Sequence, residues 1–196
     1  MEDKYTTIVD DKVGEGFYSE KRSKFLAFAH HVETQDQVKE IISTYRKKFY
    51  DARHICYAYV LGPEMSDFKV NDDGEPSSTA GKPIHGQIVS NGLTDILVVV
   101  VRYYGGVNLG TGGLIVAYRT AASEAIANCE KEEKFVKEQV VFTFPYIMMN
   151  GVMKIVKAMS PDIVFQSFDN TCTITLSIRK SKSEELKNKL DSLSFQ

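Results

Sequence analysis

The stretch ILVVVVRYYGGVNLGTGGLIVAYR, residues 96–119, combines a strand-like run, a glycine-dense loop and the beginning of a helix. The β-branched run from Ile96 to Val101 predicts a strand that is buried on both faces. The alanine-rich residues 114–131 predict a helix. Between them lie five of the chain's 13 glycines: Gly105, Gly106, Gly110, Gly112 and Gly113. A strand, a glycine loop and a helix in this order can hold an anion on the free N–H groups of the helix N-terminus.

The spacing of these glycines does not match either of the common phosphate-binding motifs. No lysine follows Gly110, so the loop is not a Walker loop, and Ile115 stands where the pattern G-x-G-x-x-G requires glycine. The loop is therefore a candidate site without an assigned ligand. The alternative is that the glycines serve only the architecture of tight turns.

The composition predicts a cytoplasmic globular protein. Of the 196 residues, 43% are hydrophobic and 26% are charged, which is ordinary for folded domains. The first residues, MEDKYTTIVDDK, lack the apolar core of a signal peptide, and we expect no membrane span. Three separated cysteines favour reduced thiols over disulfides or a zinc site. The net charge of −2 offers no support for nucleic-acid binding by the chain as a whole.

Upstream of this stretch, the pattern predicts a β-α-β beginning. A lead-in hairpin is predicted over residues 1–24, where two glycines break a polar stretch, and a strand follows from Phe25 to Val32. The sequence Thr34-Gln35-Asp36-Gln37 is a capping box, and apolar residues at helical spacing behind it predict a helix over 35–49. Residues 54–61 read as another strand.

Residues 68–86, FKVNDDGEPSSTAGKPIHG, are rich in turn formers and predict a long loop. A loop of this length inside a compact domain is usually functional or disordered. Pro83 suits the first turn of a short helix, and Gly92 suits the end of that helix.

The charged residues 131–134, KEEK, mark the predicted boundary between a domain over 1–133 and a second domain over 134–196. The second domain reads as a strand over 140–144, a methionine-containing helix, two strands joined by Asp169-Asn170, and a last helix over 183–193. The order βαββα predicts a small ferredoxin-like domain that lacks its last strand. The methionines are expected to fill its core.

Four segments carry a resemblance to a known family. They are SKFLAF (23–28), ARHICYAY (52–59), DDGEPSSTAGKPI (72–84) and VVRYYGGVNLGTGGLIVAY (100–118), and together they resemble the signature segments of the YigZ/IMPACT family. The resemblance covers residues 20–131 in order. The C-terminal sixty residues resemble, more weakly, the small domain of bacterial members, which is similar in fold to the last domain of elongation factor G. Ser78 stands where many relatives have glycine.

The resemblance implies an α+β protein whose N-terminal domain is an α/β sandwich like domain 2 of ribosomal protein S5. Eukaryotic relatives bind the activator of an amino-acid-starvation kinase with the help of an additional N-terminal domain, and this chain is expected to lack that domain. Bacterial members look like cytosolic proteins that have been suggested to bind nucleic acid or the ribosome.

The densest carboxylate cluster consists of Asp72, Asp73 and Glu75. Its oxygens suit a hard cation such as Mg²⁺, or a carboxyl group that takes part in acid–base chemistry. A solvated acidic loop with a turn at Asp73-Gly74 is the alternative, and the residues alone favour it.

His54 and Cys56 lie two residues apart on a predicted strand, so their side chains share a face. A metal pair or a Cys–His nucleophile needs such closeness together with further partners that the sequence does not identify. A buried thiol beside a hydrogen-bonded histidine is the favoured interpretation.

Arg102, Tyr103 and Tyr104 end the central strand where the glycine loop begins. The guanidinium of Arg102 suits a carboxylate or phosphate ligand, or an internal ion pair with Asp72 or Asp73. The two tyrosines point to opposite faces, so at most one of them stacks on a ligand or base. We expect the acidic loop and the glycine loop to converge, with Arg102 joining them.

These observations predict a non-catalytic binding or regulatory protein that acts near translation through a protein, ribosome or RNA partner. The alternative is a phosphate- or nucleotide-binding enzyme that uses the glycine loop 105–113, with Asp72, Asp73 and Glu75 placing Mg²⁺. We expect no bound cofactor or structural metal. The predicted binding residues are Asp72, Asp73, Glu75, Thr79, Arg102, Tyr103, Tyr104, Gly105, Gly106, Gly110, Gly112 and Gly113, with Lys24, His54 and Cys56 as secondary candidates.

Overall fold

The computed structural model describes residues 3–169 and 171–193, and it divides the chain into two compact units. One unit is Tyr5–Lys134, and the other joins the first four residues to Phe135–Gln196. Strand β1 (Lys4–Ile8) pairs with β7 (Lys131–Phe135) in a two-stranded sheet. The residues predicted as a charged joint therefore form a strand.

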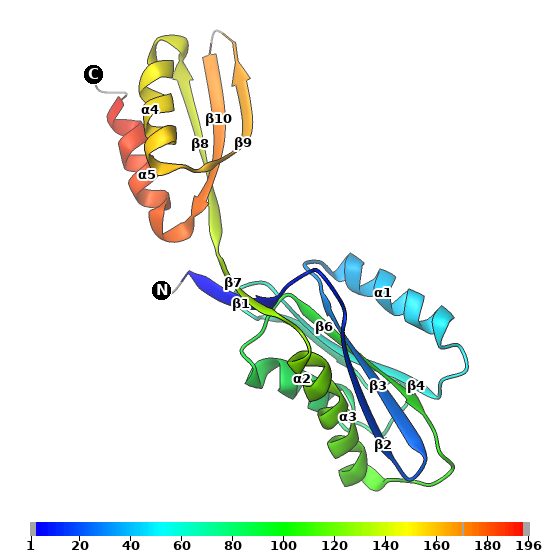
Figure 1. The fold of residues 1–196 in the computed structure, drawn as a ribbon. Helices are drawn as coiled ribbons and strands as arrows, with labels where there is room; N and C mark the ends of the chain where they lie inside the picture. Colours follow the sequence, from blue (N-terminus) through cyan, green and yellow to red (C-terminus); the bar gives the residue numbers. More distant parts are fainter. Residues whose placement is uncertain (1–2, 170, 194–196) are drawn as a thin grey trace. The chain divides into compact units, whose positions relative to one another are not determined.

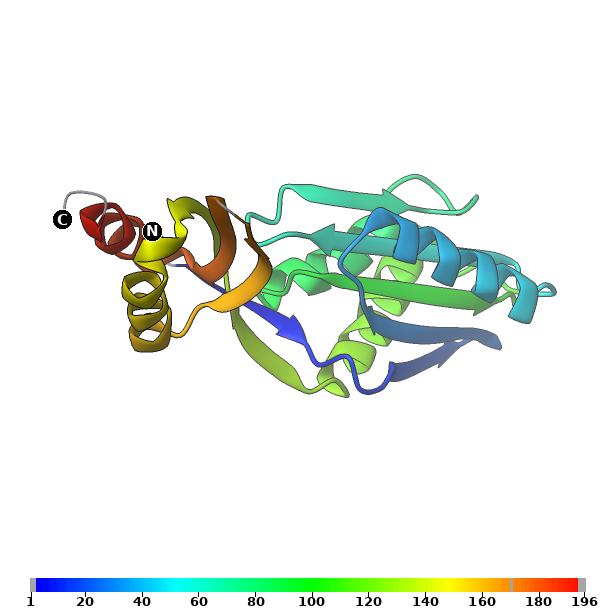
Figure 2. The ribbon, with the colours of Figure 1, turned by 90° about the horizontal axis from the view of Figure 1, so that it is seen from above.

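The first unit is built on a five-stranded antiparallel sheet with the order β2-β3-β6-β4-β5. Figures 1 and 2 show helix α1 on one face of this sheet and helices α2 and α3 on the other. The strands are β2 (Gly14–Glu20), β3 (Ser23–His31), β4 (His54–Leu61), β5 (Asp67–Asn71) and β6 (Ile96–Tyr103); the helices are α1 (Gln35–Lys48), α2 (Gly81–Ser90) and α3 (Gly110–Ala127). All the elements that carry the predicted site belong to this unit.

The central strand β6 is buried from Ile96 to Arg102, as its β-branched run predicts. Val98 and Val100 pack in the layer below α2 and α3, and Val99 and Val101 pack below α1. Because side chains alternate along a strand, Arg102 lies on the α2/α3 face and Tyr103 on the α1 face.

Helix α1 begins with the predicted capping box, in which Thr34 and Gln37 each hydrogen-bond the backbone of the other. Strand β4 has the predicted bounds, residues 54–61. The hairpin predicted over residues 1–24 is wrong, because β1 pairs with β7 and β2 pairs with β3. Gly16 lies inside β2, where a Cβ atom would collide with the carbonyl oxygen of Ala121 in α3. The glycine lets α3 lie directly on the strand.

Two predicted boundaries are wrong. The loop predicted over 68–86 is shorter, because residues 67–71 pair with β4 as the edge strand β5 and α2 begins at Gly81. The helix predicted over 114–131 begins four residues earlier, at Gly110, and ends at Ala127. Gly110, Gly112 and Gly113 therefore belong to the first turn of α3 rather than to a loop. The connecting loops that remain are residues 72–80 and 104–109.

The second unit has the predicted element order βαββα. Its elements are β8 (Lys137–Pro145), the short 3-10 helix η1 (Tyr146–Met148), α4 (Met149–Met159), β9 (Asp162–Phe168), β10 (Thr171–Arg179) and α5 (Lys180–Ser192). The strands form an antiparallel sheet in the order β8-β10-β9, with both helices on one face (Figure 1). Met149 and Met159 pack against its core, whereas Met153 is exposed. Asn170, in the predicted turn, lies outside the described residues.

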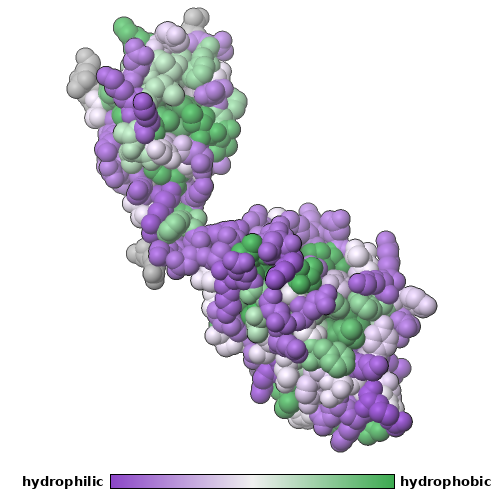
Figure 3. Space-filling view, in the orientation of Figure 1, coloured by the Kyte–Doolittle hydropathy of each residue, from purple (hydrophilic) through white to green (hydrophobic). Residues whose placement is uncertain are grey.

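Hydrophobic residues gather on the strand side of the second unit in Figure 3. Val141 of β8 and Val164, Phe165 and Phe168 of β9 are all exposed.

Asp3 and Lys4 group with the second unit, whereas the sequence pattern places them in the domain over 1–133. The reason is Asp3, whose carboxylate accepts two hydrogen bonds from Arg179, at 2.6 and 2.7 Å, and one from the backbone of Ser181. These bonds hold the pKa of Asp3 well below its ordinary value.

None of the helices in the described part of the chain combines the length and the apolar character that a membrane crossing requires.

Candidate functional site

A buried ion pair joins the two loops that the sequence predicts to converge. Arg102 at the end of β6 donates from Nη1 to Oε1 of Glu75 over 2.6 Å, and both side chains are almost fully buried. The convergence occurs as expected, but the carboxylate that meets Arg102 is Glu75 rather than Asp72 or Asp73. Arg102 also lies over the rings of Phe25 and Tyr104, at 5.4 and 5.5 Å from their centres.

The ion pair is the centre of a hydrogen-bonded cluster on the α2/α3 face of the sheet. The hydroxyl of Tyr118 in α3 donates to the same Glu75 oxygen over 2.7 Å, and the Cys56 sulfur lies 3.4 Å from that hydroxyl. His54, which pairs with Arg102 across the β4–β6 ladder, has its Nε2 3.6 Å from Oε2 of Glu75. The register of two neighbouring strands thus brings His54, Cys56 and Arg102 to one side of Glu75.

Cys56 is a buried structural thiol. Its sulfur donates to the carbonyl oxygen of Asp72 over 3.0 Å, and burial raises the pKa of the thiol well above its ordinary value. A thiol that keeps its proton is a poor nucleophile. His54 hydrogen-bonds the carbonyl oxygen of Asp73 through Nδ1 over 2.7 Å. The geometry agrees with the favoured interpretation of a buried thiol beside a hydrogen-bonded histidine.

Asp72 holds the loop 72–80 in place. One carboxylate oxygen accepts from the backbone N–H groups of Ala80 and Gly81, and the other accepts from that of Ser78. Ala80, at the N-cap of α2, has no side-chain capping bond of its own, so Asp72 caps this helix from upstream. Its oxygens are therefore occupied by the loop itself.

Asp73 is engaged in a similar way. Its Oδ2 accepts from the backbone of Ile55 over 2.6 Å, and its Oδ1 accepts from Arg46 of α1 over 3.1 Å. Thr79 is buried, and its hydroxyl donates to the carbonyl oxygen of Pro76. Asp72, Asp73 and Thr79 thus build the loop rather than face a ligand. Within the described residues, no group of three or more His, Cys, Asp and Glu side chains is arranged to hold a metal ion.

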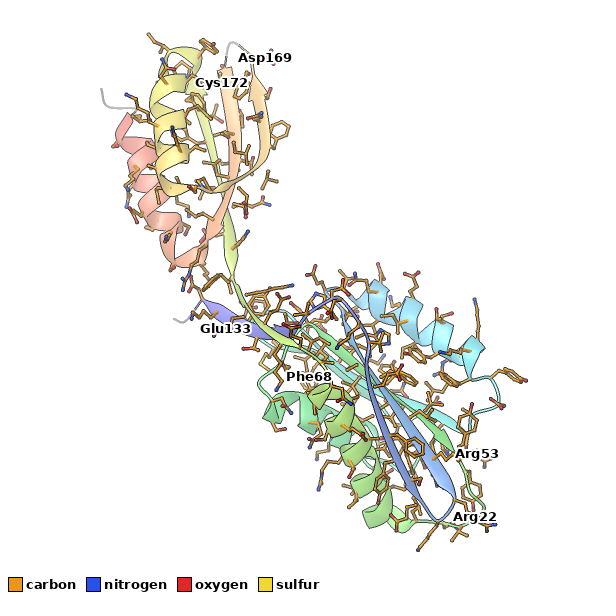
Figure 4. The ribbon with its side chains drawn as sticks, in the orientation of Figure 1. Arg22, Arg53, Phe68, Glu133, Asp169 and Cys172 are labelled. Atoms are coloured by element: carbon orange, nitrogen blue, oxygen red, sulfur yellow. The ribbon has the colours of Figure 1, made fainter. Side chains whose placement is uncertain are left out.

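Beside Glu75 and Arg102 lies a pocket of about 430 Å³, which we call the α3 pocket. It is lined by Arg53, His54, Glu75, Pro76, Arg102, Tyr104, Asn108, Leu109, Gly110, Thr111 and Leu114. Figure 4 shows Arg53 at the same end of the first unit as Arg22, which lies in the turn between β2 and β3. The pocket therefore lies where strand ends, loops and the N-terminus of α3 meet.

The first turn of α3 forms one wall of the α3 pocket. Leu109 at the N-cap makes no side-chain capping bond, so the first N–H groups of an 18-residue helix are left for another acceptor. Their partial positive charge adds to that of Arg53. The wall is thus rich in donors and positive charge.

The two tyrosines separate as predicted. Tyr104 lines the α3 pocket with 46% of its surface exposed, whereas Tyr103 lies on the α1 face and donates from its hydroxyl to Asp51. Gly105 is required beside them because a Cβ atom there would collide with the backbone of Arg22. Its N–H donates to the hydroxyl of Ser23 over 3.1 Å.

The remaining predicted residues lie at different distances from the α3 pocket. Gly110 lines it, and Gly112 and Gly113 lie in the same helical turn. Gly106 is exposed in the loop 104–109, and Lys24 is exposed on β3; neither lines the pocket. Sequence reasoning missed Arg53, Asn108 and Thr111 as pocket residues and Tyr118 as a partner of Glu75. All four lie inside the quoted motifs, but no spacing marks them there.

Known proteins resemble the chain over both units. Residues 21–126 match the sequence profile of the Impact N-terminal domain. IMPACT family member YigZ of Escherichia coli is 30% identical over 87% of this chain and 84% of its own length. IMPACT family member YvyE of Bacillus subtilis is 42% identical over 54% of this chain and 49% of its own length.

A crystal structure described as that of a hypothetical protein matches 99% of this chain and 94% of its own chain, with a TM-score of 0.78 and 28% identity. The family that the four sequence segments indicate is thus supported by a profile, by relatives and by a solved structure. The chain belongs to the IMPACT family.

Proposed function

We propose that this protein is a non-catalytic binding module that acts near translation, and that its α3 pocket takes one nucleotide unit of a single-stranded RNA. The phosphate would lie at the N-terminus of α3 beside Arg53, and the base would stack on Tyr104. The proposal also keeps the finer fold assignment, an S5-domain-2-like sandwich followed by a ferredoxin-like domain. Its place near translation rests on family membership.

One observation carries the proposal. The N-terminus of α3, which has no side-chain cap, the exposed Arg53 and the exposed ring of Tyr104 all border the same pocket. Helix N-termini and arginines bind phosphate groups. Aromatic side chains supply a platform for bases without regard to sequence. Together they match the two halves of a nucleotide.

The charge of Arg102 itself serves the protein rather than the ligand. Its ion pair with Glu75 nearly neutralises it, so the net positive charge at the pocket comes from Arg53 and the helix. Arg102→Ala would also leave Glu75 buried without its partner, which confuses a loss of binding with a loss of folding. Variants at the exposed side chains test the proposal better.

The arrangement of the carboxylates favours binding over Mg²⁺-assisted chemistry. Asp72 and Asp73 accept backbone and arginine hydrogen bonds outside the pocket, and Glu75 accepts from Arg102 and Tyr118. A Mg²⁺ ion needs carboxylate or water oxygens that are free to coordinate it. The alternative of a nucleotide-processing enzyme therefore has less support from this site.

The test is the fluorescence anisotropy of a short labelled single-stranded RNA, titrated with wild-type protein and with Arg53→Glu and Tyr104→Ala. We expect salt-sensitive binding that each variant weakens by roughly fivefold or more, since stacking of one base contributes about 1–3 kcal/mol. Arg119→Glu and Tyr50→Ala are matched controls, because both residues are exposed and lie outside the pocket.

Equal affinity of the wild type and both pocket variants would overturn the assignment of RNA to this pocket. The RNA should also remain intact after incubation with protein and Mg²⁺. Shortening of the probe would contradict the proposal that the protein is not catalytic. Co-sedimentation with ribosomes, lost in the same two variants, would tie the pocket to translation.

A further inference from the structure

A second concave surface lies between helix α1 and strands β4 and β5, on the face of the sheet opposite the α3 pocket. We call it the α1 groove; its volume is about 550 Å³. It exists because α1 is amphipathic and covers the middle of the sheet, while β5 continues past it as an exposed edge strand. The floor consists of buried apolar or aromatic side chains: Val38, Ile42, Tyr57 and Tyr59.

The rim of the α1 groove is positively charged. Lys39, Arg46 and Lys47 project from α1, and Lys69 projects from β5 on the opposite side. The other lining residues are Gln35 and Ser43, so the lining contains four cations and no carboxylate. This local charge stands out in a chain whose net charge is −2.

Nearby acids cancel only part of this charge. Asp36 pairs with Lys39 at 3.4 Å, but both side chains are largely exposed, and such pairs contribute little. Asp73 binds Arg46, and Asp67 accepts from the amide of Gln35. Lys47 comes from α1 and Lys69 from β5, the two elements that flank the apolar floor. A ligand must therefore combine negative charge with apolar groups.

We propose that the α1 groove binds an acidic segment of a partner protein, in which glutamate or aspartate alternates with apolar side chains. The carboxylates would meet the lysines on the rim, and the apolar side chains would lie on the floor. Amphipathic segments that lay an apolar face into a groove are a recurring mode of peptide recognition. This inference concerns a surface distinct from the α3 pocket and stands independently of it.

The observations favour a peptide over RNA at this surface. Tyr57 and Tyr59 are 9% and 6% exposed, so their ring faces are covered and offer no platform for bases. Base stacking is the main contribution that a nucleic acid would gain from aromatic residues. Aliphatic side chains need no exposed ring face, and they gain from the small apolar area that the floor leaves open. RNA in the groove is thus an alternative that the experiment must exclude.

The experiment uses the full chain and a labelled peptide of alternating glutamate and leucine, with anisotropy as the readout. The groove variant is Lys39→Glu/Lys47→Glu/Lys69→Glu. Its matched control, Lys12→Glu/Lys82→Glu/Lys154→Glu, changes the charge equally at exposed lysines outside the groove. We expect the groove variant to lose roughly tenfold or more in affinity, and the control to change little, because like charges facing each other across an interface are strongly unfavourable.

A second variant, Ser43→Trp, fills the groove without changing its charge, and it should also weaken peptide binding. Circular dichroism and the melting temperature show whether each variant is folded. Failure of the wild type to bind the peptide, or equal binding by the groove variant and its control, would overturn the proposal. The proposal would also be overturned if the wild type does not bind the peptide and the groove variant loses affinity for RNA, because the groove would then be an RNA site.

The same titrations separate this proposal from the proposed function. Arg53→Glu should weaken RNA binding and leave peptide binding unchanged, and the groove variant should do the reverse. A peptide of alternating lysine and leucine should not bind, and this result would show that the groove requires negative charge in its ligand.

Discussion

The α3 pocket and the α1 groove both present positive charge, but they hold it differently. In the α3 pocket, Arg102 is buried, paired with Glu75 and fixed by strand register. In the α1 groove, Lys39 and its neighbours are exposed on flexible side chains. A buried pair orders a site and is costly to break, whereas exposed charges steer ligands and contribute little to folding. Removal of a cation should therefore lower stability when the cation is the buried Arg102, and weaken binding when it is an exposed lysine of the α1 groove.

The largest change in stability is expected when the buried cation is removed. Arg102→Met should lower the free energy of unfolding by about 3–5 kcal/mol, because Glu75 is left buried without its partner. Lys47→Met, an equivalent change in the groove, should alter it by no more than about 0.5 kcal/mol. Urea denaturation measures both. Arg102→Met/Glu75→Gln should recover part of the loss, and a loss below about 1 kcal/mol in the single variant would contradict the account.

A smaller loss is expected when the capping carboxylate is removed. Asp72→Ala should cost about 1–3 kcal/mol, since three backbone N–H groups of residues 78–81 lose their acceptor. Asp67→Ala is the control, because Asp67 is exposed and only meets the amide of Gln35. Equal effects of the two substitutions in chemical denaturation would show that Asp72 does not organise the loop.

Acid should weaken the α1 side of the sheet through His30. Burial lowers the pKa of His30 below its ordinary value of 6.5, and its ring bonds the hydroxyl of Tyr45 in α1. The unfolded chain then takes up a proton near pH 6.5, whereas the folded chain takes it up only at lower pH. Stability present above pH 6.5 is therefore lost as the pH falls below that value.

Melting temperatures measured down through this pH range check the effect. His30→Gln should flatten the decline relative to wild type. His85, whose pKa is also lowered by burial, supplies a comparison on the α2 side. If the melting temperature falls equally with pH in wild type and His30→Gln, protonation of His30 does not cause the loss of stability.

The smallest effect is expected at Ser78. This residue has a φ of 64°, a left-handed conformation that a non-glycine residue adopts at a cost. Ser78→Gly should therefore raise the free energy of unfolding by up to about 1 kcal/mol, whereas Ser77→Gly, at a position without a positive φ, should not raise it. No gain, or a loss, would argue against the loop geometry.

Sequence patterns predicted the elements whose local signals agree with their packing. The capping box of Thr34 and the β-branched run of β6 act within a few residues, and both appear as expected. Strand β5 was missed because its side chains are mostly exposed, so it shows no buried alternation; its pairing with β4 is what defines it. The glycines at the beginning of α3 favour a loop in the sequence pattern. The helix nevertheless includes them, because its length and its packing stabilise the first turn.

The site was predicted in outline and misassigned in detail for a similar reason. Three acids lie close together in the sequence, and only the fold decides which of them reaches Arg102. Asp72 and Asp73 turn toward backbone N–H groups of their own unit, while Glu75 reaches the buried face beside Tyr118. Hydrogen-bond partners of this kind depend on positions distant in sequence. Spacing in the sequence could not predict that Glu75, rather than Asp72 or Asp73, pairs with Arg102.

The most direct test of the central claim is a titration of isotope-labelled protein with uridine monophosphate, followed by the amide resonances of residues 110–113. The account predicts that these amides shift together with those near Tyr104, and that Arg53→Glu suppresses the shifts. Unchanged resonances at 110–113, with shifts confined to other surfaces, would contradict a phosphate site at the N-terminus of α3.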